Sequence, residues 1–383
     1  MTREPALMTT HASADDLKPG SLPDKDPGLT LLGREPLVAE TPEELLDDAT
    51  TPIARFFVRN NGLFPAAIGD PERWTLAIDG EVERALRLTL PDLKAGFPHR
   101  TLHLVLECGG NGRSFFRPLP KGNAWTHGGV GCAAWTGVSL GDVLREAGLT
   151  PRARFTGHFG ADPDAEGRTD RQAMSRGVPI AKALEAHTLL AWGMNGEALP
   201  FSHGGPLRLV VPGWPGSLSQ KWLNRIWVRD REHDGPGMTG TSYRLPERPI
   251  APGSSGEGVP FRVIESMPVR SIVTRPADGA HHPAGTRAIT VRGAAWAGDS
   301  SVAAVDLSVD GGRTWTQARC DPLRNRYDWT RWTAELGLPS DGSFEILARA
   351  TDAEGRRQPL EPENWNPGGY ACNAVHRVVV RVG

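Results

Sequence analysis

The stretch LECGGNGRSFF, residues 106–116, places one cysteine where an apolar run ends and a glycine-rich loop begins. The residues before it, TLHLVLEC at 101–108, form a continuous β-prone run, which is typical of a strand buried on both faces. A free cysteine after such a run usually packs in a core. Here the glycines of the loop allow another group to approach the backbone, and Arg113 adds a fixed positive charge that favours a thiolate.

A thiolate at Cys108 would act as a nucleophile or as a soft metal ligand. A nucleophile needs a general base, and the nearby His103 belongs to the strand pattern rather than to the loop. A metal held by one cysteine needs further ligands, which a cofactor can supply. The chain has no C-x-x-C pair, and its Gly-Gly-Asn-Gly run lacks dinucleotide-loop spacing. The other cysteines, Cys132, Cys320 and Cys372, carry no motif that assigns them a role beyond packing.

The composition is that of a soluble globular protein long enough for two cores. The chain has 383 residues, of which 39% are hydrophobic and 23% charged, and a formal net charge of −2. Its 45 glycines, 33 prolines and 12 tryptophans favour strands and loops over long helices. The charge gives no sign of nucleic-acid binding, and no apolar run approaches the roughly 18 residues of a membrane span. The first thirty residues contain neither an apolar signal region nor a twin-arginine start, so we expect a cytoplasmic protein.

The sequence divides into segments of different character. Residues 1–45 are polar and interrupted by prolines, so we expect an arm packed on the surface, with Thr41 capping a short helix. Residues 46–250 mix strand patterns with one amphipathic helix pattern, SLGDVLREAGL at 139–149, with serine as its N-cap and glycine as its stop. In the same segment, WTLAIDGEV at 74–82 predicts a hairpin with Asp-Gly at its tip.

The C-terminal part of the chain has the pattern of an all-β domain. Proline, glycine and serine cluster at 244–261, as in a linker. Residues 251–383 then consist of short strand patterns, and VDGGRTW at 309–315 predicts a hairpin with Gly-Gly at its turn. We expect a β-sandwich of immunoglobulin-like type. The predicted fold class is therefore α+β: a mixed α/β domain whose loops form a pocket, followed by this sandwich.

Several segments, in order along the chain, carry a family resemblance. They include FFVRNNG (56–62), LECGGNGRS (106–114), SRGVPI (175–180), QKWL (220–223) and WNPGGYACNAVHRVVV (365–380). With these segments the chain resembles the sulfite oxidase family of molybdenum enzymes over roughly residues 50–383. The resemblance implies a molybdopterin-binding catalytic domain at 46–250 and an immunoglobulin-like dimerisation domain at 251–383.

The resemblance implies roles for individual residues. In that family one loop cysteine holds a molybdenum whose other sulfurs come from the dithiolene of molybdopterin, and Cys108 matches that cysteine. Arg59 and Arg113 would flank an oxyanion substrate, and Trp125 would form a wall of the pocket. The residues implied to bind the pterin and its phosphate are Asn60, Asn61, His203, Arg208 and Lys221. Guanidinium groups and an ammonium group suit a phosphate, and a thiolate suits molybdenum.

Three positions depart from the family pattern. Asn61 replaces a histidine, Met174 stands where the family has a tyrosine, and Gly368 stands where it has a substrate-facing arginine. Fewer positive charges weaken the attraction for a dianion, because each charge-assisted hydrogen bond contributes about 1.5–3 kcal/mol. Arg176, two residues after Met174, is a candidate to supply the missing charge.

The resemblance implies an oxidoreductase that contains molybdenum and molybdopterin and transfers an oxo group to sulfite, giving sulfate. We expect no haem domain of cytochrome b5 type, so the electrons would pass to an external acceptor, either a soluble carrier or dioxygen. A homodimer is also implied. Two alternatives stay open: the same cofactor acting on a less anionic substrate, such as a sulfoxide in the reductive direction, and a non-catalytic relative that acts as an interaction protein.

Overall fold

The computed structural model describes residues 24–66 and 68–383, and its secondary structure is mostly strand, with few and short helices. The predicted dominance of strands and loops is confirmed, and residues 1–23 of the predicted arm lie outside the described residues. The strands of the first region are β1 (Thr30–Gly33), β2 (Val38–Glu40), β3 (Val58–Arg59), β4 (Thr75–Gly80), β5 (Leu86–Thr89), β6 (His99–Glu107), β7 (Val130–Ser139), β8 (Phe155–Gly160), β9 (Leu189–Met194), β10 (Glu197–Ala198), β11 (Arg208–Val210) and β12 (Leu223–Arg229). The α-helices are α1 (Leu90–Gly96), α2 (Leu140–Ala147) and α3 (Ile180–Ala183).

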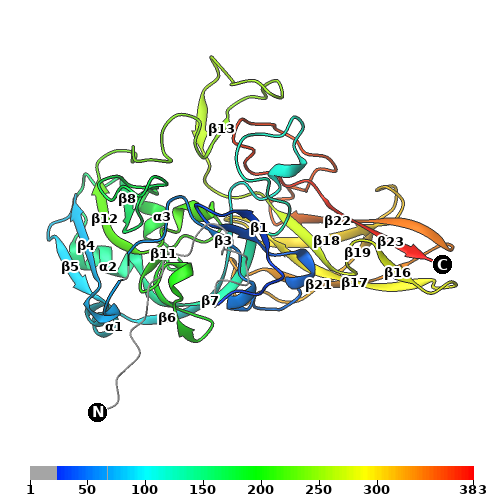
Figure 1. The fold of residues 1–383 in the computed structure, drawn as a ribbon, viewed down its shortest axis with the longest axis horizontal. Coiled ribbons are helices and arrows are strands. Elements are labelled where there is room, and N and C mark those ends of the chain that lie inside the picture. The colour runs from blue at the N-terminus through cyan, green and yellow to red at the C-terminus, as the bar shows by residue number, and fades with distance from the viewer. Residues whose placement is uncertain (1–23, 67) are drawn as a thin grey trace, which may run out of the picture.

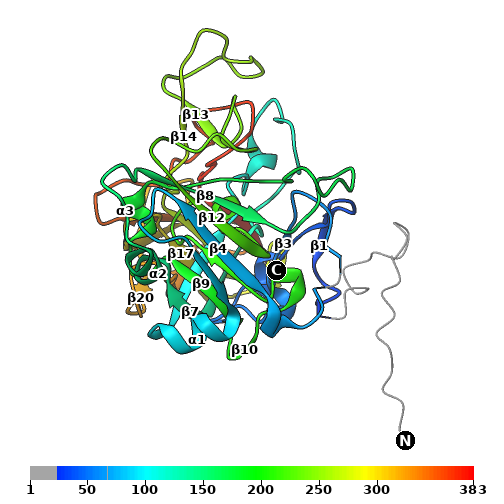
Figure 2. The same ribbon diagram turned by 90° about the vertical axis from the view of Figure 1, so that its left-hand side faces the viewer.

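Two sheets build the larger part of the molecule, on the left of Figure 1. One has the strand order β10-β9-β7-β6, with β11 also paired to β9, and the other has the order β5-β4-β12-β8. Figure 2 shows β4, β8 and β12 on the side of the molecule that faces away from the C-terminal unit. Apolar side chains from both sheets and from α1 and α2 form one core, which includes Leu76, Leu93, Val138, Leu144, Leu190 and Ile226.

The strand that precedes Cys108 lies at one edge of its sheet. β6 pairs with β7 along its whole length, from His99 opposite Val138 to Glu107 opposite Val130, and its last four residues are buried. The predicted amphipathic helix is confirmed as α2, which ends at Gly148, although the side chain of Ser139 makes no capping hydrogen bond. The predicted hairpin is confirmed, because β4 and β5 pair antiparallel, but its predicted tip is wrong, because Asp79 and Gly80 still belong to β4 and pair with β12.

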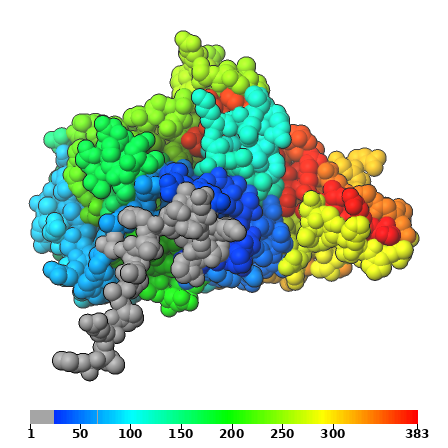
Figure 3. All heavy atoms as spheres, viewed as in Figure 1, coloured from blue at the N-terminus to red at the C-terminus, as the bar shows by residue number. Residues whose placement is uncertain are grey.

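The segment 24–45 is built into the fold and is not an arm on the surface. β2 pairs with β1 and with β3, and all three residues of β2 are buried. The expected helix is a single 3-10 turn at Glu43–Leu45, and Thr41 donates its hydroxyl to the carbonyl of Arg55 at 2.5 Å instead of capping it. The prediction missed these strands because they are too short to show an apolar period. Figure 3 shows this segment in dark blue across the front of the molecule.

The predicted linker is a hairpin. β13 (Arg244–Pro246) pairs antiparallel with β14 (Phe261–Val263), and the proline- and glycine-rich residues between them form its long loop. In Figure 1 this hairpin projects from the top of the molecule, above the junction of the two parts. The strand pairing makes the connection a defined element rather than a flexible spacer.

The C-terminal unit is all-β and has two layers. Its strands are β15 (Arg270–Arg275), β16 (Ala280–His282), β17 (Ala288–Trp296), β18 (Val302–Ser308), β19 (Thr316–Gln317), β20 (Arg319–Cys320), β21 (Thr330–Gly337), β22 (Gly342–Asp352) and β23 (His376–Val382). They form one sheet of order β15-β17-β21-β20 and a second of order β16-β23-β22-β18-β19. A core with Val291, Val305, Trp332, Ile346 and Val378 lies between them. The Gly-Gly hairpin between β18 and β19 is confirmed, and the immunoglobulin-like type stays a prediction.

The two parts share a buried cluster at their junction. Leu46, Val105 and Cys132 of the first region pack with Ile272, Trp296 and Trp329 of the C-terminal unit. The C-terminal unit therefore lies directly against β6 and β7. In the described part of the chain, no helix is both long and apolar enough to cross a membrane.

Candidate active site

A cavity lies at the end of β6, and most of the predicted site residues line it. Those that do are Arg59, Asn60, Asn61, Cys108, His203, Arg208 and Lys221. They come from β3, from the loop after β6, from the turn Phe201–His203, from β11 and from the segment before β12. The cavity is narrow and opens to solvent, and polar and basic side chains make up much of its lining.

Cys108 is held firmly at this cavity by its backbone. Its N–H donates to the carbonyl of Gly129 at 2.8 Å, and its carbonyl accepts from the N–H of Asn111 at 2.9 Å. The residue is 7% exposed. No hydrogen bond joins its sulfur to a histidine or a carboxylate among the described residues, so the geometry favours the metal-ligand alternative over an activated nucleophile.

Basic side chains gather in and behind one part of the cavity wall. His203 and Lys221 line it, and Lys25 lies behind His203, with Nζ donating to the carbonyl of Ile53 at 2.7 Å and contacting His203 Nε2. Burial lowers the pKa of Lys25 to about 8. Burial and the neighbouring charge of Arg208 lower the pKa of Lys221 well below its ordinary value. Such mutual repulsion is relieved when an anion binds among these groups.

Arg208 and Lys221 are positioned by backbone groups rather than by acids. Arg208 donates to the carbonyl of His203 at 2.8 Å and to that of Ser219 at 3.0 Å, and burial lowers its pKa to about 9. Gly204 makes room for Lys221, because a Cβ at this position would lie 2.6 Å from the Cβ of Lys221. Gly204 also adopts a φ of +97°, which favours glycine. Neither side chain pairs with an acid in the described structure, so both have N–H groups available to an anionic ligand.

The donors of this cavity fit a pterin that carries a phosphate. Asn60 accepts a hydrogen bond from Lys221 through Oδ1, while its buried Nδ2 has no hydrogen-bond partner in the described structure. Asp162 is the only acid among the described lining residues, and burial raises its pKa to about 6. An orphaned donor beside an excess of basic groups suits a phosphate, and the cysteine sulfur nearby suits molybdenum.

Arg113 does not line the cavity, which differs from the expectation that it flanks the substrate. Its Nε donates to the carbonyl of Gly368 at 2.7 Å and its Nη1 to that of Asn123 at 2.8 Å. The glycines of the loop make room for this arginine itself, since a Cβ on Gly110 would collide with the guanidinium group and one on Gly122 would lie 2.7 Å from Nη1. The guanidinium therefore ties three loops together instead of pointing at the cavity.

Trp125 also lies behind the cavity wall rather than in it. The residue is fully buried, and its ring meets that of Phe57 edge to face, with 6.0 Å between ring centroids. Phe57 is the residue that lines the cavity on this side. Trp125 thus packs as a core residue that supports the wall, and no sequence pattern separates that role from a direct one.

Two of the three tyrosines of the chain meet at the cavity. Tyr243 lines it, and its ring stacks on that of Tyr370 with centroids 4.9 Å apart. A side chain at Gly368 would collide with the ring of Tyr370, so the tyrosine fills the space that an arginine at that position would need. Met174 lines the cavity as well. The absence of a tyrosine at 174 therefore does not leave the cavity without a phenol.

Three residues of the site escaped the sequence analysis. Lys25 lies in a segment that was expected to be an arm, Asp162 lies in an acidic loop without a motif, and Tyr243 lies just before the predicted linker. For Tyr243 the sequence offers one signal, namely that the chain contains only three tyrosines. All three reach the site through contacts between segments that are distant in sequence, which local patterns do not encode.

The C-terminal unit holds the end of β6 from behind. The carboxylate of Glu107, the residue before Cys108, accepts hydrogen bonds from Arg270 at 3.1 Å, from Trp296 at 2.8 Å and from the side chain of Asn111 at 3.0 Å. Arg270 and Trp296 lie on β15 and β17. Glu107 and Arg270 are both buried, so this ion pair is a fixed link between the two parts of the molecule.

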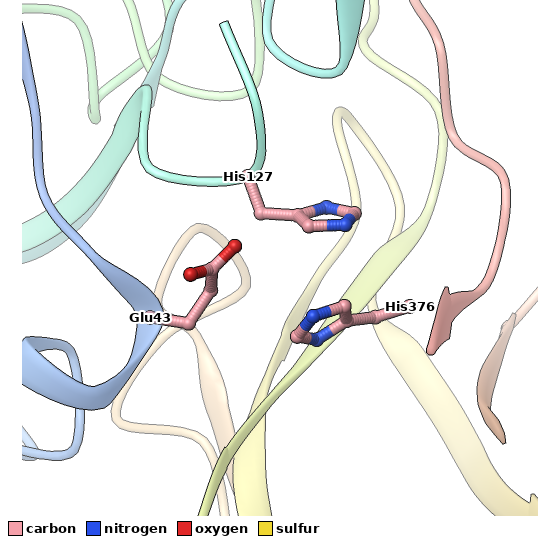
Figure 4. A group of neighbouring side chains, drawn as sticks. All are labelled: Glu43, His127 and His376. Atoms are coloured by element: carbon pink, nitrogen blue, oxygen red, sulfur yellow. The ribbon is translucent and has the colours of Figure 1, made fainter. Parts of the chain in front are cut away.

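A second group of side chains at the junction has the spacing of a metal site. Figure 4 shows Glu43, His127 and His376 side by side, and one ligand atom of each lies within 4.8 Å of the others. The Nδ1 atoms of both rings already accept hydrogen bonds, in His127 from Arg270 at 3.1 Å and in His376 from a backbone N–H at 2.9 Å. In the neutral rings each Nε2 then carries the proton and has no lone pair for a metal. The two histidines therefore act as hydrogen-bond acceptors at the junction rather than as metal ligands.

Comparison with known proteins identifies the family. Residues 62–237 match the family described as oxidoreductase molybdopterin binding domain, and residues 261–383 match the Mo-co oxidoreductase dimerisation domain. The chain is 36% identical over 374 residues to sulfite oxidase of Gallus gallus, covering 93% of this chain and 78% of that protein. It is 34% identical over 396 residues to mitochondrial sulfite oxidase of Homo sapiens, covering 99% and 69%.

Related proteins with other names also match. Nitrate reductase [NADH] 2 of Phaseolus vulgaris is 32% identical over 376 residues, covering 92% of this chain and 42% of that protein. The crystal structure of the sulfane dehydrogenase SoxCD from Paracoccus pantotrophus superposes with a TM-score of 0.76 at 27% identity, covering 91% of this chain and 85% of that chain. The chain therefore belongs to the sulfite oxidase family, and it is an oxidoreductase whose cofactor is molybdenum with molybdopterin.

Proposed function

We propose that this protein oxidises sulfite to sulfate at a molybdenum bound by Cys108. Sulfite and water give sulfate, two protons and two electrons, and the electrons pass to an external acceptor, a soluble carrier or dioxygen. The observation that carries the proposal is the position of Cys108, whose backbone is fixed at a cavity lined by four basic residues and one acid among the described residues. An oxyanion is attracted into such a site.

The bound cofactor supplies the two-electron oxo-transfer chemistry. The residues of the chain bind and orient it: Arg208, Lys221 and the free Nδ2 of Asn60 are suited to hold the phosphate and the pterin, and Cys108 is suited to hold the metal. Their hydrogen bonds to backbone carbonyls keep the donors in place before the cofactor arrives. Preorganised donors of this kind lose little freedom on binding.

Arg59 is the lining arginine that is suited to face a substrate. It ends β3, where it lies opposite Val38 of β2, and it is half-buried. Its Nη1 donates to the carbonyl of Asn60, which leaves further guanidinium N–H groups for an oxyanion. The pairing of β3 with β2 therefore gives the 24–45 segment a part in positioning the substrate-facing charge.

A less anionic substrate is the second candidate, and the position of Arg113 favours it. Since Arg113 donates to two backbone carbonyls and residue 368 is a glycine, the cavity has fewer free charges than the family pattern implies. A sulfoxide, reduced to a sulfide with release of water, would need less charge. The same cofactor and the same cysteine would serve either reaction.

Steady-state assays on the purified holoenzyme separate the two candidates. We expect turnover of sulfite with a dye or cytochrome acceptor, and none of a sulfoxide with a reduced dye. The opposite result, in a sample that contains one molybdenum per chain, would overturn the oxidase proposal. Metal analysis of the same sample provides the control for incomplete cofactor loading.

The dimerisation domain supports a homodimer with two-fold symmetry, formed through residues 261–383. We propose that this all-β unit is of immunoglobulin-like type, on the basis of its two antiparallel-rich sheets and shared core. Sedimentation at low micromolar concentration tests the assembly. A single species with the mass of one chain would contradict it.

A further inference from the structure

Arg176 is a buried charge beside the cavity with almost no partners. The residue is 1% exposed, and its Nη1 donates to the hydroxyl of Ser217 at 2.8 Å. Its Nε and Nη2 are buried and make no hydrogen bond in the described structure. Its guanidinium lies over the ring of Tyr243, with 4.6 Å between Cζ and the ring centroid. An unpaired charge in this position destabilises the fold unless something else compensates for it.

The other buried arginines of the described residues each donate to at least two carboxylate or carbonyl oxygens, although Nε of Arg270 also lacks a partner. They are Arg229 and Arg270, which pair with carboxylates, and Arg113 and Arg208, which each donate to two or more backbone carbonyls. Arg176 has one neutral hydroxyl and one ring. Arg113 and Arg208 also lack an acid, so what distinguishes Arg176 is that it has neither a carboxylate nor a carbonyl acceptor among the described residues.

The two neighbours of Arg176 both belong to the cavity wall near Cys108. Ser217 and Tyr243 line the same cavity as Cys108. A Cβ on Gly109, the residue after the cysteine, would lie 3.6 Å from the ring of Tyr243. Because the oxygen of Ser217 accepts from Arg176, its hydroxyl hydrogen is available for donation into the cavity. The guanidinium group of Arg176 therefore lies behind Ser217 and Tyr243, at the end of the cavity that Cys108 lines.

We infer that Arg176 is a positioning residue for anion selection, which acts through the hydroxyl of Ser217 on an oxyanion bound at the Cys108 end of the cavity. Arg176 supplies positive charge near the bound anion, which Arg113 does not do because its guanidinium group donates to backbone carbonyls. The inference rests on the proposed function, because it names a small oxyanion as the class of substrate. A charged donor chain of this kind strengthens the hydrogen bond to an anion.

The test uses inorganic sulfate as a probe that binds without reacting. Calorimetric titration of the molybdenum-loaded enzyme with sulfate measures binding, and steady-state kinetics measure KM and kcat for sulfite. The variants are Arg176→Gln, Arg176→Lys and Ser217→Ala. Arg349→Gln is the matched control, since Arg349 also lies over a ring, that of Trp315 at 3.8 Å, and also has an unpartnered Nε, but it belongs to the C-terminal unit.

We expect Arg176→Gln and Ser217→Ala to raise the Kd for sulfate and the KM for sulfite by at least about tenfold, with a smaller change in kcat. Arg176→Lys restores part of the affinity, and Arg349→Gln leaves it unchanged. A fully loaded Arg176→Gln enzyme that binds sulfate within about twofold of the parent overturns the inference. If Arg176→Gln does not fold, Ser217→Ala decides alone, and unchanged sulfate affinity there also overturns it.

The failure of this inference differs from the failure of the proposed function. If sulfite is not oxidised but sulfate binding still depends on Arg176, the anion site stands and the proposed reaction falls. If sulfite is oxidised with the same KM in the parent and in Arg176→Gln, the reaction stands and the role of Arg176 falls.

Discussion

Replacing Arg113 by glutamine is expected to loosen three loops rather than to change the selection of charged substrates. Arg113 is 7% exposed, and its guanidinium group donates to the carbonyls of Gly368 and Asn123. It also lies 5.5 Å from the ring centroid of Tyr370. A glutamine is too short to bridge both carbonyls and carries no charge.

The magnitude follows from the two hydrogen bonds. Each charge-assisted bond contributes about 1.5–3 kcal/mol, and the carbonyls of Gly368 and Asn123 are left unpaired, so the loss is roughly 3–6 kcal/mol. For a region of this size that corresponds to a fall in Tm of at least about 6 °C. Tyr370 is two residues from Gly368 and stacks on Tyr243 at the cavity, so the loosened loop also lowers turnover. Sulfite and a neutral substrate should lose activity to the same extent.

Thermal unfolding and steady-state kinetics of matched variants check this prediction. Arg113→Lys keeps the charge but lacks the planar fork, and we expect it to lose nearly as much stability as Arg113→Gln. Arg117→Gln is the control, because Arg117 also donates to two backbone carbonyls but is exposed, where such bonds contribute little. The reasoning is refuted if Arg113→Gln keeps its Tm and loses affinity for sulfite alone, or if lysine restores function.

Three further changes have defined outcomes. Cys108→Ser should remove bound molybdenum, as measured by metal analysis, with an unchanged circular dichroism spectrum, because a serine oxygen is a poor ligand for a soft metal. Gly204→Ala should displace Lys221 and lower pterin retention, which fluorescence after oxidative release measures; full retention would contradict the packing described here. Burial lowers the pKa of His376 to about 4 from 6.5, so its contribution to stability is complete above pH 6.5 and is lost, by about 3 kcal/mol, as the pH falls to 4. His376→Asn keeps an acceptor for the N–H of Val273, and the difference in urea midpoint between about pH 7.5 and about pH 5 should shrink; an unchanged difference would show that His376 does not titrate on unfolding.

The sequence predicted the elements whose patterns are long and regular. β6, α2 and the β18–β19 hairpin were expected from apolar runs, helical spacing and turn glycines, and each is present. β1 and β2 were missed, because strands of three or four residues carry too few positions to show a period. The paired strands that flank the predicted linker were missed because prolines and glycines dominate the loop between them.

The family resemblance named residues that lie together in the structure, and their roles as ligands stay a prediction. Cys108, Arg208 and Lys221 came from segments that match the family, and they line one cavity. Whether Arg113 points into that cavity depends on the carbonyl of Gly368, which lies 255 positions further along the chain. A local pattern cannot report such a contact. The same limit applies to Arg176, whose importance follows from the absence of partners rather than from any motif.

The buried ion pair between Glu107 and Arg270 links the C-terminal unit to the loop that contains Cys108. Arg270 and Trp296 donate to Glu107, the residue before Cys108, so the support of this cysteine depends on residues more than 160 positions further along the chain. A fragment that ends at the β13–β14 hairpin would lack Arg270 and Trp296 and would also uncover the apolar side chains of Leu46, Val105 and Cys132. Loss of the C-terminal unit should therefore alter the cavity even though no residue of that unit lines it among the described residues.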